Sequence, residues 1–116
     1  MDAGTSTSAG KDNKDSKKSH PEVKSMKEFF QLPFGKVLRQ NSQSMKKYYQ
    51  GQKMYKITAK IPETSLKIGD IFYLDALEKN HLEVFDAHGN IKTVLNLDGT
   101  VNVKKSNAAK GRKIKI

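Results

Sequence analysis

The chain has 116 residues, of which 22 are lysine or arginine and 12 are aspartate or glutamate, giving a net charge of +10 at pH 7. Such a surplus of positive charge favours a polyanionic partner: nucleic acid, an acidic protein or an anionic membrane surface. The sequence contains no cysteine, which excludes disulfides, thiolate catalysis and thiolate metal sites. No apolar run is long enough to span a bilayer, and the N-terminus lacks the basic and apolar parts of a signal peptide.

The composition changes about twenty residues into the chain. Residues 1–20 are small, polar and charged, with no apolar periodicity, which predicts a disordered leader or linker. Residues 21–116 contain most of the apolar side chains and are predicted to form one domain.

Two helices are predicted at the start of this domain. The first covers residues 21–32, where apolar side chains recur at helical spacing, and Pro33 is expected to end it. The second covers residues 41–51, with serines as possible N-caps and Gly51 as the residue that follows its C-terminal end.

Beyond the second helix the apolar period changes to two, which indicates strands. Turn signals separate the runs, and Asp98-Gly99 between two of them is typical of a hairpin. The predicted strands are residues 53–61, 71–77, 81–86, 91–97 and 100–103. The chain is therefore predicted to be an α+β protein, with short N-terminal helices followed by an antiparallel meander of about four or five strands.

Charge is unevenly distributed along the domain. Residues 34–75 carry a net charge of +5 and residues 104–116 carry +6, whereas residues 76–103 between them carry −2. A passive phosphate binder gains nothing from carboxylates at its centre, because each one repels the nucleic-acid backbone. A nuclease does need a carboxylate to accept a proton, with cations around it to hold the phosphate.

The candidate catalytic residues are Asp75, His81, Glu83 and Arg112. In the strand HLEVFD, His81 and Glu83 share one face, and Asp75 ends the preceding strand, so it is expected beside His81 across the loop. RNA cleavage without a metal needs a base for the 2′-hydroxyl, an acid for the leaving oxygen and a cation for the transition state. A carboxylate beside an imidazole supplies the first two, and Arg112 supplies the third.

Each assignment has a plainer alternative. A His-x-Glu pair on a strand is usually a solvated face, and Asp75 is equally suited to cap a turn. No metal ligand set and no cofactor site is predicted. The predicted RNA-binding residues combine rings that stack bases with lysines that bind phosphate: Tyr73, Phe85, Lys104, Lys105, Lys110 and Lys113.

The stretch GDIFYLDALEKNHLEVFDAHGNIKTVLNLDGTVNVKKSNAAKGRKI, residues 69–114, resembles the cytotoxic ribonuclease domain of the ribosome-cleaving colicins. Related toxin tips occur on other bacteriocins and on contact-dependent inhibition proteins. Asp75, Glu83 and Arg112 match residues of the family pattern. The family's histidine lies three positions after the aspartate, where this chain has Glu78. Either His81 takes over the acid role, or Glu78 and His81 share it, or the activity is altered.

The resemblance implies a curved antiparallel sheet and a metal-free endoribonuclease that cuts small-subunit ribosomal RNA in the decoding region, which blocks translation. It also implies a larger delivery protein as the parent chain, an acidic immunity protein as a partner, and secretion or delivery into the cytoplasm of a target cell. Two alternatives stay open: a non-catalytic RNA- or ribosome-binding module, and a toxin nuclease that acts on transfer RNA.

Overall fold

The computed structural model describes residues 22–115, so the predicted leader, residues 1–20, lies outside the described residues. The predicted α+β fold is confirmed: short helices precede a five-stranded antiparallel sheet, and a further helix follows it. Within the described part of the chain, no helix has the length and apolar character needed to cross a membrane. The elements are α2 (Met26–Phe29), α3 (Pro33–Gln40), β2 (Ser42–Tyr49), β3 (Gln52–Ile57), β4 (Ile71–Leu74), β5 (His81–Phe85), β6 (Ile91–Asn96) and α4 (Val103–Ala108).

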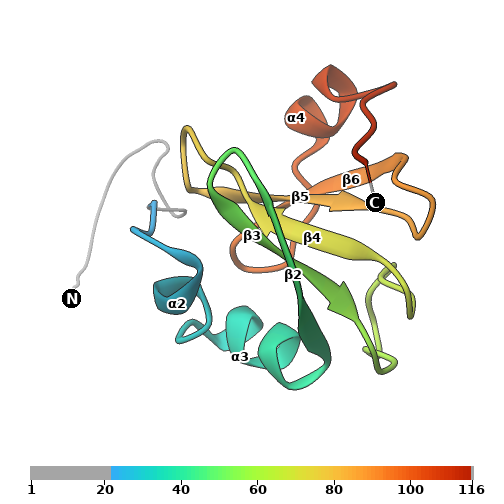
Figure 1. The fold of residues 1–116 in the computed structure, drawn as a ribbon. Coiled ribbons are helices and arrows are strands. Elements are labelled where there is room, and N and C mark those ends of the chain that lie inside the picture. The colour runs from blue at the N-terminus through green and yellow to red at the C-terminus, as the bar shows by residue number, and fades with distance from the viewer. Residues whose placement is uncertain (1–21, 116) are drawn as a thin grey trace.

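The sheet is a meander in which every strand pairs with its neighbours in the sequence, in the order β2-β3-β4-β5-β6. Strand direction turns strongly from β2 to β6, and α2 and α3 lie at the opposite end of the molecule from α4 (Figure 1). In the β4–β5 pair, Tyr73 lies opposite Glu83 and Ile71 lies opposite Phe85. All four side chains therefore belong to the same face of the sheet.

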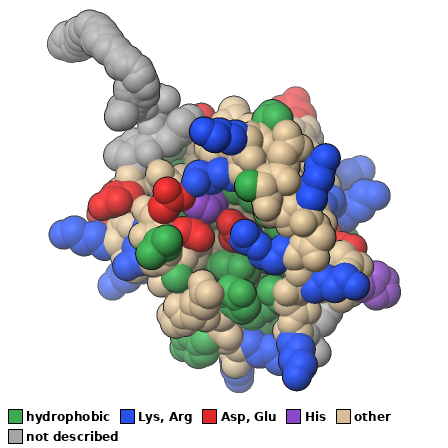
Figure 2. Space-filling view, turned by 90° about the horizontal axis from the view of Figure 1, so that it is seen from above, with side chains coloured by type: hydrophobic (Ala, Val, Ile, Leu, Met, Phe, Trp, Pro, Cys, Tyr) green, Lys and Arg blue, Asp and Glu red, His purple; other side chains and the backbone are tan. Residues whose placement is uncertain are grey.

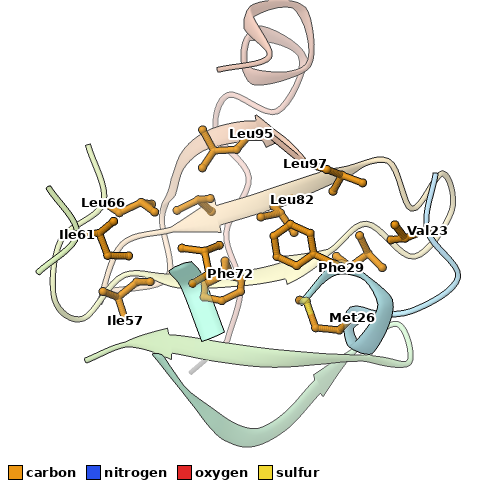
Figure 3. Close-up of a cluster of buried hydrophobic side chains, with 13 residues drawn as sticks. Val23, Met26, Phe29, Ile57, Ile61, Leu66, Phe72, Leu82, Leu95 and Leu97 are labelled. Carbon is orange, nitrogen blue, oxygen red and sulfur yellow. The ribbon is translucent and has the colours of Figure 1, made fainter. Parts of the chain in front are cut away.

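Apolar side chains are buried on both faces of the central strands. The larger cluster lies on the face covered by α2, where Phe29 is fully buried against side chains such as Phe72 and Leu82 (Figure 3). The smaller cluster lies on the opposite face and includes Tyr73 and Phe85. This second layer of apolar packing surrounds the polar side chains of β5.

The segment predicted as the second helix, residues 41–51, is instead strand β2. Its partly buried residues include Ser42, Met45 and Tyr49, which are three and four positions apart, as in a helix. A register shift in the pairing with β3 produces this spacing, since a bulge interrupts the period of two. Gly51, at φ +83°, belongs to the tight turn between β2 and β3 rather than to a helix end.

The other boundaries also differ from the prediction. Only part of residues 21–32 is helical, and Pro33 begins α3 instead of ending a helix, because proline is favoured in the first turn, where its missing N–H is not needed. Residues 100–103 do not form a strand: Val101 makes a single bridge to Leu95 of β6, and Val103 begins α4. The basic tail then folds into α4, whose N-cap Asn102 accepts a hydrogen bond from the Lys105 amide at 3.0 Å.

Candidate active site

The polar face of β5 is buried. His81 and Glu83 are each 3% exposed, and Phe85 on the same face is fully buried. Leu82 and Val84 point the other way, into the larger apolar cluster. The solvated-face alternative is therefore wrong, because the smaller cluster and the C-terminal segment cover this side of the strand. Ionisable side chains buried like His81 and Glu83 need hydrogen bonds or ion pairs to offset the loss of water.

An oxygen atom of a neighbouring side chain lies close to each ring nitrogen of His81. Its Nε2 lies 3.2 Å from Glu83 Oε2 and 3.6 Å from Asp75 Oδ1, and its Nδ1 lies 2.8 Å from the side-chain oxygen of Asn80. An amide oxygen and a carboxylate oxygen both accept hydrogen bonds. Each ring nitrogen therefore has an acceptor for an N–H group, and Nε2 faces the two carboxylates.

Asp75 caps a turn and also lies beside His81. Its Oδ2 accepts hydrogen bonds from the amides of Leu77 at 3.1 Å and Glu78 at 2.7 Å, which caps the turn after β4. Its other oxygen is the one near His81. The amide of Asp75 also donates to the His81 carbonyl at 3.1 Å, so the loop holds the two residues side by side.

Arg112 reaches the same cluster from the C-terminal segment. Its guanidinium donates from Nη1 to Glu83 Oε1, the oxygen that does not face the histidine. The backbone fixes this position, because the Arg112 carbonyl accepts from the Ile91 amide at 2.9 Å and its amide donates to the Ala109 carbonyl at 3.0 Å. The side chain is 43% exposed, so it links a buried carboxylate to the solvent.

Glu78 lies on the other side of the imidazole. Its Oε1 is 3.8 Å from His81 Nδ1, the nitrogen that faces away from Glu83, and it forms an ion pair with Lys105 of α4. The Glu78 side chain is 48% exposed. Of the two residues considered for the histidine role, His81 is the one whose side chain contacts the carboxylates of both Glu83 and Asp75.

Aromatic rings pack beside His81 and Glu83 on the same face of the sheet. Tyr73 stacks on Phe85 with centroids 5.7 Å apart, and it packs against Tyr49 at a tilt of 31° with centroids 5.1 Å apart. Tyr73 is 2% exposed and Phe85 is fully buried, so neither ring has a free face and the predicted base stacking does not fit this structure. Burial, reinforced by the charge of Glu83, raises the pKa of the Tyr73 phenol well above its usual value.

Cations surround the acidic cluster. Figure 2 shows a histidine among acidic side chains on one face of the molecule, with lysine or arginine side chains around them. Of the predicted phosphate-binding residues, Lys104, Lys110 and Lys113 are exposed, while Lys105 is half-buried in its pair with Glu78. The first three are therefore free to contact a polyanion.

Two features of the site were not found from the sequence. Asn80, which fixes the orientation of the imidazole, lies in an irregular loop whose conformation the periodicity does not reveal. Tyr49, which packs on Tyr73, lies in the segment that was predicted to be a helix. The structure also shows that Asp75, His81 and Glu83 each offer an atom to a possible metal ion, with these atoms all within 4.8 Å of one another.

Comparisons of the chain with protein-family models, with curated proteins and with solved structures find no match. The resemblance of residues 69–114 to the ribosome-cleaving colicins is carried by short motifs and stays a prediction.

Proposed function

We propose that this chain is an endoribonuclease toxin domain that cleaves RNA by metal-independent acid–base transphosphorylation. The observation that carries the proposal is the buried contact between His81 and Glu83, with Asp75 beside the same ring nitrogen and Arg112 on the other carboxylate oxygen. These are the acid, the base and the cation that the reaction requires. The exposed lysines of the tail supply the attraction for a polyanionic substrate.

The contacts support one division of labour. Glu83 pairs with the Arg112 guanidinium through Oε1 and faces His81 with Oε2, so it is the base that accepts the proton of the 2′-hydroxyl. His81 donates the proton on Nε2 to the leaving 5′-oxygen. The 2′-oxygen attacks phosphorus as the bond from phosphorus to the 5′-oxygen breaks, which leaves a 2′,3′-cyclic phosphate and a free 5′-hydroxyl. Asp75, whose Oδ1 lies 3.6 Å from Nε2, keeps the imidazole in place.

Arg112 controls access to the base. In the free chain its guanidinium covers Glu83, which is only 3% exposed. A substrate phosphate arriving from solvent meets the exposed part of this side chain first. The planar guanidinium has five donors and binds phosphate in a forked geometry, so the phosphate competes with the carboxylate for it. Substrate binding thereby uncovers Glu83 at the position where the 2′-hydroxyl needs a base.

The proposed substrate is small-subunit ribosomal RNA, in the decoding region. The resemblance of residues 69–114 supports this choice, and the charge of the chain supports a polyanion in general. The same resemblance supports a toxin delivered by a larger protein into a rival cell's cytoplasm, with an acidic immunity protein in the producing cell. Transfer RNA is the competing substrate.

The proposal is tested by incubating the purified chain with intact bacterial ribosomes, and separately with transfer RNA, in the presence and absence of EDTA. We expect a discrete fragment from the 3′ end of the small-subunit RNA on a denaturing gel, with and without EDTA. The new 3′ end should carry a cyclic phosphate. A strict magnesium requirement would refute the metal-free reaction.

Other results point to the alternatives. Cleavage of transfer RNA alone would identify the chain as a nuclease with that substrate. Intact RNA, together with binding that weakens steeply as salt rises, would identify a non-catalytic RNA-binding module. A charge-neutral substitution at Glu83 would then leave RNA binding unchanged.

A further inference from the structure

The atoms around His81 Nε2 have the spacing of a metal site. Zinc binds histidine nitrogen and carboxylate oxygen at roughly 2.0–2.2 Å, which places the donors of a tetrahedral site about 3.4 Å apart. Here Nε2 lies 3.2 Å from Glu83 Oε2 and 3.6 Å from Asp75 Oδ1, and all three groups lie within 4.8 Å of one another. We propose that Asp75, His81 and Glu83 form a zinc-binding site with three protein ligands and one open position.

The polar atoms of these side chains that would not bind the metal already form hydrogen bonds with other groups of the chain. The Nδ1 of the imidazole donates to Asn80 at 2.8 Å, which fixes the ring and leaves Nε2 as the coordinating nitrogen. The second oxygen of Glu83 accepts from Arg112, and the second oxygen of Asp75 accepts from two backbone amides of its turn. Outer contacts of this kind orient the ligands of metal sites in proteins.

The donor set and its surroundings select the kind of metal. Two carboxylates balance the charge of a divalent cation, and the side chains of His81 and Glu83 are each 4% exposed, so the ion would be largely removed from water. An imidazole nitrogen suits zinc and similar transition metals, whereas magnesium favours an octahedral shell of oxygens. Zinc is therefore the metal that this site fits best.

Zinc at this position would block the proposed reaction. It would occupy Nε2 of His81, which donates the proton, and an oxygen of Glu83, which accepts one. The expected consequence is reversible inhibition of RNA cleavage that EDTA relieves. This consequence rests on the proposed function, whereas the binding of zinc does not.

Arg112 distinguishes zinc binding from catalysis. Its positive charge contacts Glu83, so it repels a second cation at the same carboxylate. Arg112→Ala should therefore bind zinc more tightly than the wild type. The same substitution should reduce cleavage, because it removes the cation that holds the phosphate. Arg112→Ala should thus raise the affinity for zinc and lower the rate of RNA cleavage.

The binding test uses the full chain without a polyhistidine tag, titrated with zinc chloride against a fluorescent zinc indicator. We expect one zinc ion per wild-type chain. Asn80→Ala should weaken binding by about 10- to 100-fold, and His81→Ala should abolish it. His88→Ala is the matched control, because His88 is an exposed histidine in the turn after β5, and it should bind like the wild type.

Two results of the titration would overturn the site: a wild-type chain that takes no zinc from the indicator, or binding that is lost in His88→Ala and kept in both Asn80→Ala and His81→Ala. Thermal unfolding without metal shows whether each variant is folded. If His81→Ala does not fold, Asn80→Ala still tests the site. A parallel cleavage assay separates the two proposals. Absence of cleavage without zinc refutes the proposed function while the titration still decides the site, and cleavage accelerated by zinc would overturn the inhibitory role.

Discussion

Glu83→Gln is the sharpest test of the proposed chemistry, because it removes the charge of the base while nearly preserving its shape. General acid–base catalysis by one positioned group contributes about 10²–10⁴-fold to a rate. Cleavage by this variant should therefore fall by about that factor. The measurement is the initial rate of fragment formation from ribosomes at equal concentrations of each protein.

The lower cleavage rate must not come from unfolding. The structure gives the expected loss of folding stability in Glu83→Gln. Glutamine keeps an oxygen for Arg112, where one charge-assisted hydrogen bond becomes a neutral one. Its NH2 group replaces the Glu83 oxygen that faces His81, and because NH2 is a donor it no longer accepts from Nε2–H. A charge-assisted hydrogen bond contributes about 1.5–3 kcal/mol, and a guanidinium that is 43% exposed recovers part of this from water. We expect a loss of about 1 kcal/mol, which lowers Tm by about 4–8 °C.

Glu78→Gln is the matched control. It makes the same chemical change in the other carboxylate near His81, but this side chain is 48% exposed and its ion pair with Lys105 lies at the surface. It should cost about 0–1 kcal/mol and leave cleavage near the wild-type rate. Wild-type cleavage by Glu83→Gln would refute the assignment of the base. A large loss in Glu78→Gln alone would move the acid–base role to Glu78.

Three further predictions concern the fold around the site. A Cβ at Gly35 would lie 1.8 Å from the Phe29 carbonyl oxygen, so Gly35→Ala should destabilise the chain by about 3 kcal/mol in urea unfolding; an unchanged midpoint would contradict this packing. The raised pKa of Tyr73 means that the folded chain keeps a proton that the unfolded chain loses above about pH 10. Stability should therefore decline as the pH rises past this value, and Tyr73→Phe should show a shallower decline in urea midpoints measured across it. Ser106 Oγ accepts from the Val94 amide at 2.9 Å, so Ser106→Ala should cost about 1–3 kcal/mol, and faster hydrogen exchange at that amide would show it.

The central strands could be predicted from the sequence because alternating apolar residues and the turn residues between the runs indicate the same strands. That agreement also predicted the correct face for each side chain of β5, and it placed Asp75 beside His81 across the loop. Local pattern is enough for these contacts, because a hairpin brings together residues that are close in the chain. The position of Arg112 against Glu83 is different, since 29 residues separate them and no periodicity connects the tail to β5.

The errors have local physical causes. Residues 41–51 were predicted as a helix from their serines and Gly51, but Ser42 and Ser44 lie in β2 and Gly51 lies in the turn that follows it. Tyr73 and Phe85 were expected to stack RNA bases, because the sequence does not show that both faces of β4 and β5 are covered. Burial of this kind depends on how distant segments pack together. It could not be predicted from alternation within one strand.

Both edges of the sheet are closed to further strands. On β2, the bulge and the exposed lysines Lys46 and Lys47 disrupt the row of backbone groups that another chain would need for pairing. On β6, the outward amides of Ile91 and Val94 already donate to the Arg112 carbonyl and to Ser106. The segment that brings a cation to the acidic cluster thus also protects this edge. A chain shortened before Arg112 should lose the ion pair and expose the Ile91 amide, and with it become prone to edge-to-edge aggregation.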